Sequence, residues 1–320
     1  MLYPAELPGR LGPPVARGPA RFAVVLRPWA MTASGEGAKT VSQRRSASSM
    51  KSAPTHPARR RAVAAALALA FAFAGGRAAA CGAAGGAVQA ASVDARGEIA
   101  LSDGRRLRLA GLDLPLPARG DPGLAAAARA LLSERFVGRE AALTLVSAAP
   151  DRWDRALGDL NAPAVGAAPA SAADALIAAG LARVRPEYET RGCEAARLAL
   201  ESAARAKGLG VWRDPDYVVL AADDLASLAR RDGRFVIVEG VVRRIGLGRA
   251  RLYLDLGGRG ALSVVASRKT QAAFQTAGAP LTALAGEKIR VRGALDSRFG
   301  PQLEIVDPLM LERLGRAEAK

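Results

Sequence analysis

In the first half of the chain, apolar residues recur in two patterns. In some segments every second residue is apolar, as in a strand, and in others the apolar residues have the spacing of about 3.6 residues that is typical of a helix. Two short alternating runs, 99–101 and 107–109, flank the turn Ser102-Asp103-Gly104 and predict a β-hairpin. Longer stretches with helical spacing predict three helices, at 124–136, 171–179 and 194–207. Further extended segments are expected at 141–146, 156–160 and 181–184. These elements predict a domain that combines strands with helices.

The second half of the chain has a different pattern, in which short alternating runs are separated by glycine-rich turns. Five such runs predict strands, at 235–242, 252–256, 262–265, 288–292 and 303–305. A helical segment, 269–276, interrupts the series, and a short helix is expected at 310–314. Five short strands in about 80 residues are typical of a small OB-type barrel. We place the domain boundary at Asp214-Pro215-Asp216, which separates a domain 81–215 from a domain 216–320.

Residues 1–80 precede both domains and differ from them in composition. Residues 1–49 are rich in Pro, Gly, Ser and Arg, so we expect them to be disordered or to lie upstream of the true start codon. Residues 50–80 have the layout of a secretory signal peptide, with basic residues, a thirteen-residue apolar run (62–74) and small residues at 78–80. That run is shorter than the roughly 20 residues that span a bilayer. We therefore expect export to the periplasm or the cell exterior, with no membrane span in the mature chain.

The net charge of +16 is lower when residues 1–80, here called the leader, are left out. Residues 1–80 hold 12 of the 46 Lys and Arg but 2 of the 30 Asp and Glu, which leaves a balance of +6 on the remainder. Such a balance is compatible with weak attraction to nucleic acid. His56, the single histidine, lies in the same leader. The mature chain therefore excludes Ser-His and Cys-His catalytic pairs and a His-ligated zinc.

The two cysteines, Cys81 and Cys193, allow two interpretations. Cys81 directly follows three alanines, an arrangement similar to a lipoprotein signal in which the cysteine carries a lipid anchor. Alternatively, the two cysteines form a disulfide with each other in an oxidising compartment. We favour the disulfide, because an exported chain with two cysteines rarely leaves one of them free.

Three motifs occur in the first domain in a fixed order. They are SDGRRLRLAGLDLP at 102–115, DRWDRAL at 151–157, and AGLARV at 179–184 followed by a cysteine-bearing helix and KGLGVW at 207–212. Their order and spacing resemble the thermonuclease family, whose strand motif is D-R-[YF]-G-R-x-L and whose last motif is G-L-x-x-W. The resemblance covers residues 88–213 and implies a five-stranded OB-type barrel with packed helices.

The resemblance also implies calcium-dependent phosphodiesterase chemistry, in which carboxylates hold the ion, a glutamate activates water and two arginines bind the phosphate. Carried over by position, Arg108 and Arg155 match the two arginines, and Asp113 matches one metal carboxylate. The alternative for the arginines is a solvated strand face or a structural ion pair with Asp113 or Asp154. Asp113 is equally explained as a turn residue before a proline.

Two acidic positions of the family motif are replaced in this chain. The family's D-G-D-T run falls on residues 95–98, which puts Gly97 at a metal ligand, and Leu116 stands where the glutamate is expected. Asp94 and Glu98 flank the gap and could substitute, although neither is in register with the motif. We therefore expect no resident cofactor, with Ca²⁺ bound only if the residual site is functional. Enzyme activity is left open.

A second candidate site lies in the second domain, where Lys288, Arg290 and Arg292 alternate with apolar residues. In a half-buried strand these cations share one face, which could follow a phosphate backbone. A solvated outer face is the alternative explanation. Aromatic residues make up 4% of the chain, so stacking partners for bases are scarce.

Taken together, the sequence predicts a mainly β fold with helices (α+β), a thermonuclease-type OB barrel followed by a second, OB-like barrel. The leading functional hypothesis is a nucleic-acid- or phosphate-binding module with lost or weak nuclease activity, its partner a single-stranded or flexible nucleic acid. An active calcium-dependent endonuclease is the first alternative, because both arginines remain. An envelope interaction protein that binds no nucleic acid, with an unknown protein partner, is the second, because the charge is modest.

Overall fold

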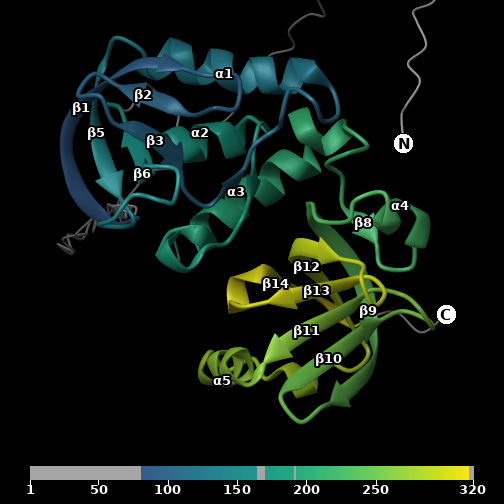
Figure 1. Ribbon diagram of the computed structural model, residues 1–320. Helices are drawn as coiled ribbons and strands as arrows, with labels where there is room; N and C mark the ends of the chain where they lie inside the picture. The colour runs from purple at the N-terminus through teal and green to yellow at the C-terminus, as the bar shows by residue number, and fades with distance from the viewer. Residues whose placement is uncertain (1–80, 164–169, 191, 317–320) are drawn as a thin grey trace, which may run out of the picture. The chain divides into compact units, whose positions relative to one another are not determined.

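The computed structural model describes residues 81–163, 170–190 and 192–316, and Figure 1 shows their elements. The signal peptide and the start expected at residues 1–80 lie outside the described residues. All described residues belong to one compact unit. Within them, no helix combines the length and the apolar character that crossing a membrane requires.

The first barrel closes through five strands in the order β1 (Ala83–Val93), β2 (Ile99–Leu101), β3 (Arg106–Leu109), β6 (Arg155–Asn161) and β5 (Glu140–Leu145). The predicted hairpin is confirmed as β2 and β3, because alternation buries Leu107 and Leu109 and turns Arg106 and Arg108 outward. β3 and β6 run parallel, whereas the other neighbours are antiparallel. Strand β1 was not predicted, because its alanines and glycines carry no clear alternation of apolar and polar residues.

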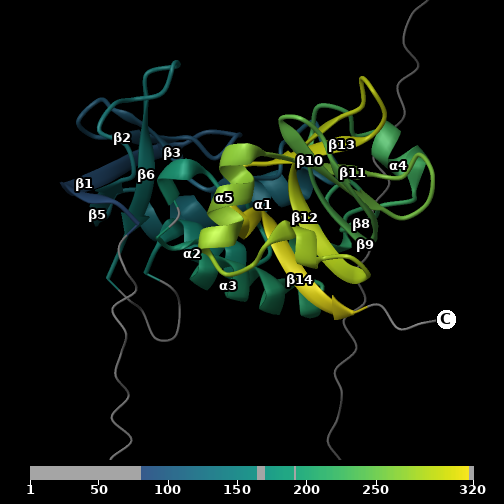
Figure 2. The same ribbon diagram turned by 90° about the horizontal axis from the view of Figure 1, so that it is seen from below.

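The three helices expected in the first domain are confirmed as α1 (Pro122–Phe136), α2 (Ala172–Ala178) and α3 (Glu194–Ala206). The Asp121 carboxylate caps α1 and Pro122 occupies its first turn, which together define where this helix begins. Helices α2 and α3 lie side by side (Figure 2). A small antiparallel pair, β4 (Leu112–Asp113) and β7 (Arg183–Val184), and the 3₁₀ turns Tyr188–Thr190 and Gly210–Arg213 complete this part.

The second barrel closes through β9 (Phe235–Leu247), β10 (Arg251–Leu256), β11 (Ser263–Ser267), β13 (Gln302–Ile305) and β12 (Glu287–Asp296), which pairs back with β9. This strand order, with α5 (Arg268–Thr276) between the third and fourth strands, is that of an OB fold. The leucines and valines that alternate along these strands form its core. The predicted α+β class with two barrels is therefore confirmed. Two short elements, β8 (Leu220–Ala221) and α4 (Leu225–Ala229), precede the barrel in the sequence. The 3₁₀ turn Leu281–Ala283 follows α5.

The predicted helix at 310–314 is wrong. Pro308–Met310 forms a single 3₁₀ turn capped by Asp307, and Leu311–Arg316 then forms strand β14, antiparallel to β12. Cross-strand ion pairs join β14 to β12, among them Arg313 to Glu287 and Glu312 to Arg290. A five-residue helix is marginal by itself, so an available strand edge and these ion pairs decide the conformation.

The Cys81–Cys193 disulfide is present, with a Cα–Cα distance of 5.5 Å. It joins Cys81, two residues before the start of β1, to the N-cap residue of α3. The described part of the chain contains no free cysteine.

Candidate functional site

The two arginines that match the family's phosphate ligands lie on neighbouring strands. Arg108 on β3 pairs in parallel register with Leu157 of β6, and Arg155 pairs with Arg106. Their side chains are 28% and 20% exposed, so both guanidinium groups remain accessible from solvent. The pairing of β3 with β6 therefore brings together two cations that are distant in sequence.

Arg108 is held by a carboxylate that the sequence did not indicate. Its Nη1 and Nη2 atoms donate to Oε1 and Oε2 of Glu187 at 3.1 and 3.0 Å, a bidentate ion pair. The backbone N–H of Gly111 donates to the same carboxylate at 3.2 Å. Glu187 therefore occupies the face of Arg108 on which a phosphate would bind, and neither Asp113 nor Asp154 pairs with this arginine.

Arg155 is held by two carboxylates. Its Nε and Nη2 atoms donate to Asp151 Oδ2 at 3.0 and 2.7 Å, and its Nη1 donates to Glu98 at 3.2 Å. The hydrogen bonds that Arg155 donates lower the pKa of Asp151 to about 2, and donating to the Asp151 carboxylate raises the pKa of Arg155. Glu98 also accepts from Arg106. Glu98 therefore connects Arg106 and Arg155 in one network of ion pairs.

An exposed tryptophan lies beside this network. The Trp153 side chain is 54% exposed, and the guanidinium carbons of Arg152 and Arg155 lie 4.0 and 4.9 Å from its ring centre. Asp154, at the place of the family motif's glycine, is the single non-glycine residue with positive φ in the described ranges (φ 58°). Aspartate tolerates this conformation better than most residues, so the turn keeps its shape without the glycine.

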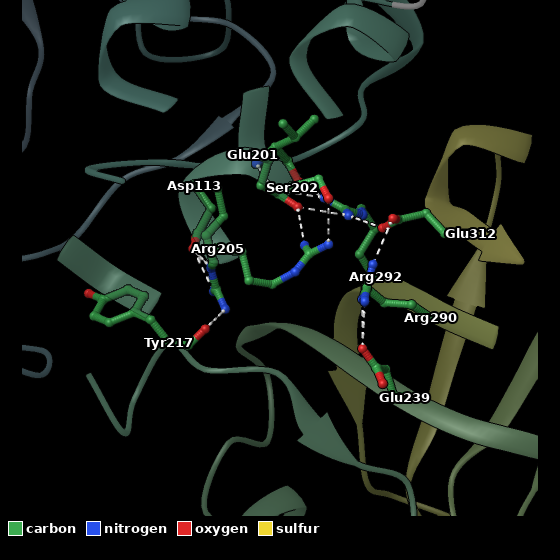
Figure 3. Close-up of polar contacts among 11 residues, drawn as sticks. Asp113, Glu201, Ser202, Arg205, Tyr217, Glu239, Arg290, Arg292 and Glu312 are labelled. Carbon is green, nitrogen blue, oxygen red and sulfur yellow. Dashed lines mark hydrogen bonds and ion pairs between the residues drawn. The ribbon is translucent and has the colours of Figure 1, made fainter. Parts of the chain in front are cut away.

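Asp113, expected as a metal ligand, forms a structural ion pair instead. Its Oδ2 atom accepts from Nε and Nη2 of Arg183 at 3.0 and 2.6 Å. Arg183 is 1% exposed and also donates to the backbone carbonyls of Tyr217 and Phe235. Figure 3 shows this contact beside Tyr217. Asp113 therefore neutralises a buried arginine that anchors the segment entering the second barrel.

The two replaced acidic positions cannot easily be restored by their surroundings. Gly97 has φ +78°, and a Cβ atom there would lie 2.7 Å from Leu114 Cδ1, so an aspartate would be strained and crowded. The Asp94 carboxylate closes the same turn by accepting from the backbone N–H groups of Arg96 and Glu98. Leu116 is 42% exposed and supplies no oxygen ligand from its side chain.

These residues do not fit a calcium ion. Calcium requires several oxygen ligands, and the carboxylates of Asp94, Glu98 and Asp113 are each engaged by other groups. Throughout the ranges that the structure describes, no group of three or more His, Cys, Asp or Glu residues is arranged to hold a metal.

The cations of β12 are all ion-paired. Lys288 and Arg290 pair with Glu239, and Arg290 also pairs with Glu312. Arg292 has no exposed surface and donates to Glu201 of α3 at 3.0 Å and to Glu312 (Figure 3). The expectation of an accessible cationic face therefore fails for Arg292, because a helix of the first domain covers it. The alternation was predicted correctly, but along this face only Lys288 is exposed, whereas Arg290 is half-buried and Arg292 is buried.

The described domains are thus two OB-type barrels, the first with helices packed on it. Residues 106–214 match the family model of staphylococcal nuclease homologues, so the first barrel carries a thermonuclease-like domain, as the sequence motifs indicated. The matched residues include Arg108, Asp113 and Arg155, whereas the second barrel lies outside the match. A search of curated proteins finds no significant match to this chain.

Proposed function

We propose that this protein is an exported nucleic-acid-binding protein whose thermonuclease-like domain binds a phosphodiester without hydrolysing it. The observation that carries the proposal is the pair Arg108 and Arg155 on adjacent strands, both reachable from solvent. Guanidinium groups match phosphate oxygens in a bidentate geometry. The exposed ring of Trp153 beside them offers a stacking surface for a base.

Loss of hydrolysis follows from the chemistry that the site lacks. Cleavage needs a group that activates water, and Leu116 at the expected position accepts no proton. It also needs a cation that offsets developing negative charge, and Gly97 removes a ligand for one. Arginines alone bind a phosphate without breaking its ester bonds.

Export is the second part of the proposal. It is supported by the signal-peptide layout of residues 50–80 and by the Cys81–Cys193 disulfide, since disulfides persist in oxidising compartments. Sequencing the N-terminus of the protein isolated from cells tests it. A mature chain that begins near Cys81 supports export, and a full-length cytoplasmic chain contradicts it.

The binding proposal predicts a measurable loss when both arginines are removed. Arg108→Ala with Arg155→Ala should weaken oligonucleotide binding by about 10- to 100-fold, as expected for lost charge-assisted hydrogen bonds. Fluorescence anisotropy at low and moderate salt measures this loss. Arg139→Ala, which removes an exposed arginine before β5, is the matched control.

The same samples test hydrolysis and the alternative functions. With calcium added, the wild-type protein should leave DNA intact. Robust cleavage that disappears in Arg108→Ala would establish the active nuclease instead. Absence of any salt-dependent binding would favour an envelope interaction protein.

A separate prediction concerns the carboxylate that faces Arg108. Glu187→Gln should strengthen phosphate or oligonucleotide binding by about 3- to 10-fold, because the ligand no longer displaces a bidentate ion pair. The amide keeps an acceptor for the Gly111 N–H. Glu189→Gln removes the same charge from an exposed position two residues away and should have little effect. Equal gains in both variants would mean that net charge alone acts.

A further inference from the structure

The Cys81–Cys193 disulfide lines a cavity of the first barrel. The cavity has a volume of about 300 Å³, and both cysteines are half-buried, so a small thiol can approach the bond. The other walls include polar side chains of three elements, Thr144 of β5, Asn161 of β6 and Asp174 of α2. A disulfide that a thiol can reach is open to exchange, whereas one enclosed in a core is not.

One of the two cysteines is placed to leave as a thiolate. Cys193 is the N-cap residue of α3, a helix of 13 residues. The N-terminus of a helix carries partial positive charge and stabilises a neighbouring thiolate, and a stabilised thiolate leaves a disulfide faster. Attack on Cys81 Sγ, with Cys193 Sγ as the leaving atom, is therefore the favoured direction of exchange.

Cys193 is also joined by hydrogen bonds to residues 187–190, here called the Glu187 turn. The Cys193 N–H donates to the Thr190 carbonyl at 3.2 Å. The next residue, Glu194, has no exposed surface and accepts from the Glu187 N–H at 2.9 Å and from the Thr190 hydroxyl. The disulfide therefore fixes one end of a short hydrogen-bonded connection that reaches Glu187.

The Glu187 turn supplies the carboxylate that occupies Arg108. Glu187 forms the bidentate pair with this arginine and accepts from the Gly111 N–H. Thr190 packs on the same glycine, since a Cβ atom at Gly111 would lie 3.2 Å from Thr190 Cγ2. A partly exposed ion pair contributes little unless its groups are already ordered, so a looser turn would hold the carboxylate on Arg108 less firmly.

The rest of α3 is held independently of the disulfide. Arg197 is buried and donates to Asp159 at 2.5 Å and to Asp174 at 3.0 Å. Further along the helix, Glu201 pairs with Arg292. Breaking the disulfide therefore leaves the body of the helix in place and frees its first turn together with the Glu187 turn.

We propose that Cys81–Cys193 is a thiol-exchange site, at which a dithiol reductant releases the Glu187 turn and so frees Arg108 for a phosphate. One thiolate of the reductant attacks Cys81 Sγ, the bond between the two cysteines breaks, and its electron pair leaves on Cys193 Sγ. The second thiol of the reductant then displaces Cys81 Sγ. The reductant ends as a cyclic disulfide, and its two protons pass to the two cysteine thiols. The effect on phosphate rests on the function proposed above, whereas the release of the turn does not.

Hydrogen exchange followed by mass spectrometry tests the release without any phosphate. In the disulfide-bonded protein, dithiothreitol should speed amide exchange in residues 187–190 at least about tenfold, whereas the amides of β3 and β6 should keep their protection. Cys81→Ser with Cys193→Ser is the matched control, in which exchange at 187–190 should be fast from the start and unaffected by dithiothreitol. Unchanged exchange at 187–190 in the wild-type protein would overturn the proposal. An equal increase in β3 and β6, or a loss of circular dichroism, would also overturn it, because the bond would then hold the whole barrel.

A second variant tests the connection while the disulfide stays intact. Thr190→Val keeps the shape of this buried side chain but removes the hydroxyl that contacts Glu194 and the Glu187 N–H. Exchange at 187–190 should become about 2- to 10-fold faster, as for the loss of one hydrogen bond. Unchanged exchange would contradict a connection through Glu194.

Fluorescence anisotropy with an oligothymidine tests the consequence for Arg108. Reduction should strengthen binding by about 3- to 10-fold in the wild-type protein and add nothing in Glu187→Gln, where the competing charge is already absent. An equal gain in both proteins, or no gain in a wild-type protein that binds the oligothymidine, would overturn the proposal. If the turn is released but neither redox form binds the oligothymidine, the phosphate-binding function fails and the exchange site stands.

Discussion

Glu201→Gln should lower the free energy of unfolding by about 3–5 kcal/mol, the cost of removing one partner of a buried ion pair. Glu201 has no exposed surface and accepts from Arg292, Arg205 and the Val184 N–H (Figure 3). The glutamine keeps the shape but brings an NH₂ group towards guanidinium donors and removes the charge that compensates Arg292. Urea unfolding measures the effect.

Arg292 makes this loss severe because it has nowhere to move. Burial by itself would lower its pKa, but Glu201 and Glu312 raise the pKa of Arg292 above its ordinary value. The arginine therefore stays charged inside the protein, and Glu312 is the carboxylate that remains to it in the variant. A buried cation that loses one of its two carboxylate partners lowers the stability of the fold, because its desolvation is then less well compensated.

The control for this prediction is an ion pair with a solvent-exposed arginine. Arg244→Gln breaks the Arg244–Asp255 pair, whose arginine is 77% exposed, and should cost no more than about 1 kcal/mol. Glu201→Met combined with Arg292→Met should recover part of the stability lost in Glu201→Gln, because both charges leave together. A loss in Glu201→Gln no larger than that in Arg244→Gln would show that this network contributes little.

Local patterns in the sequence predicted most elements of both barrels. Regular alternation identified β10 and β12, and the glycine-terminated helical runs identified α1 and α3, because these signals depend on neighbouring residues. Strand β14 was missed because its conformation depends on the free edge of β12, which a local pattern does not contain.

The site was less predictable for the same reason. The motifs indicated Arg108 and Arg155, which lie on the neighbouring strands β3 and β6, but their partners include residues from distant segments. Glu187 lies 79 residues beyond Arg108, and Glu201 lies 91 residues before Arg292. Sequence alternation predicts which residues share a strand face, whereas the element that covers the face follows from tertiary packing.

Removing the disulfide is the second change with a large expected effect. Cys81→Ala with Cys193→Ala should lower the free energy of unfolding by about 2–5 kcal/mol. The bond closes a loop with a sequence separation of 112 residues, for which the chain-entropy model gives about 4–5 kcal/mol. Its removal frees the segment that leads into β1 from the start of α3, so the unfolded ensemble gains more freedom than the folded state.

Reductant provides the internal control for the cysteine variant. Dithiothreitol should shift the urea midpoint of the wild-type protein towards that of the variant and leave the variant itself unchanged. An equal shift in both would mean that the reductant acts elsewhere, and no shift in either would mean that the bond does not stabilise the fold. Mass spectrometry of the protein from cells completes the test, because a lipid on Cys81 would exclude the pairing. A mass two hydrogens below that of the reduced chain is expected, since forming one disulfide removes two hydrogens.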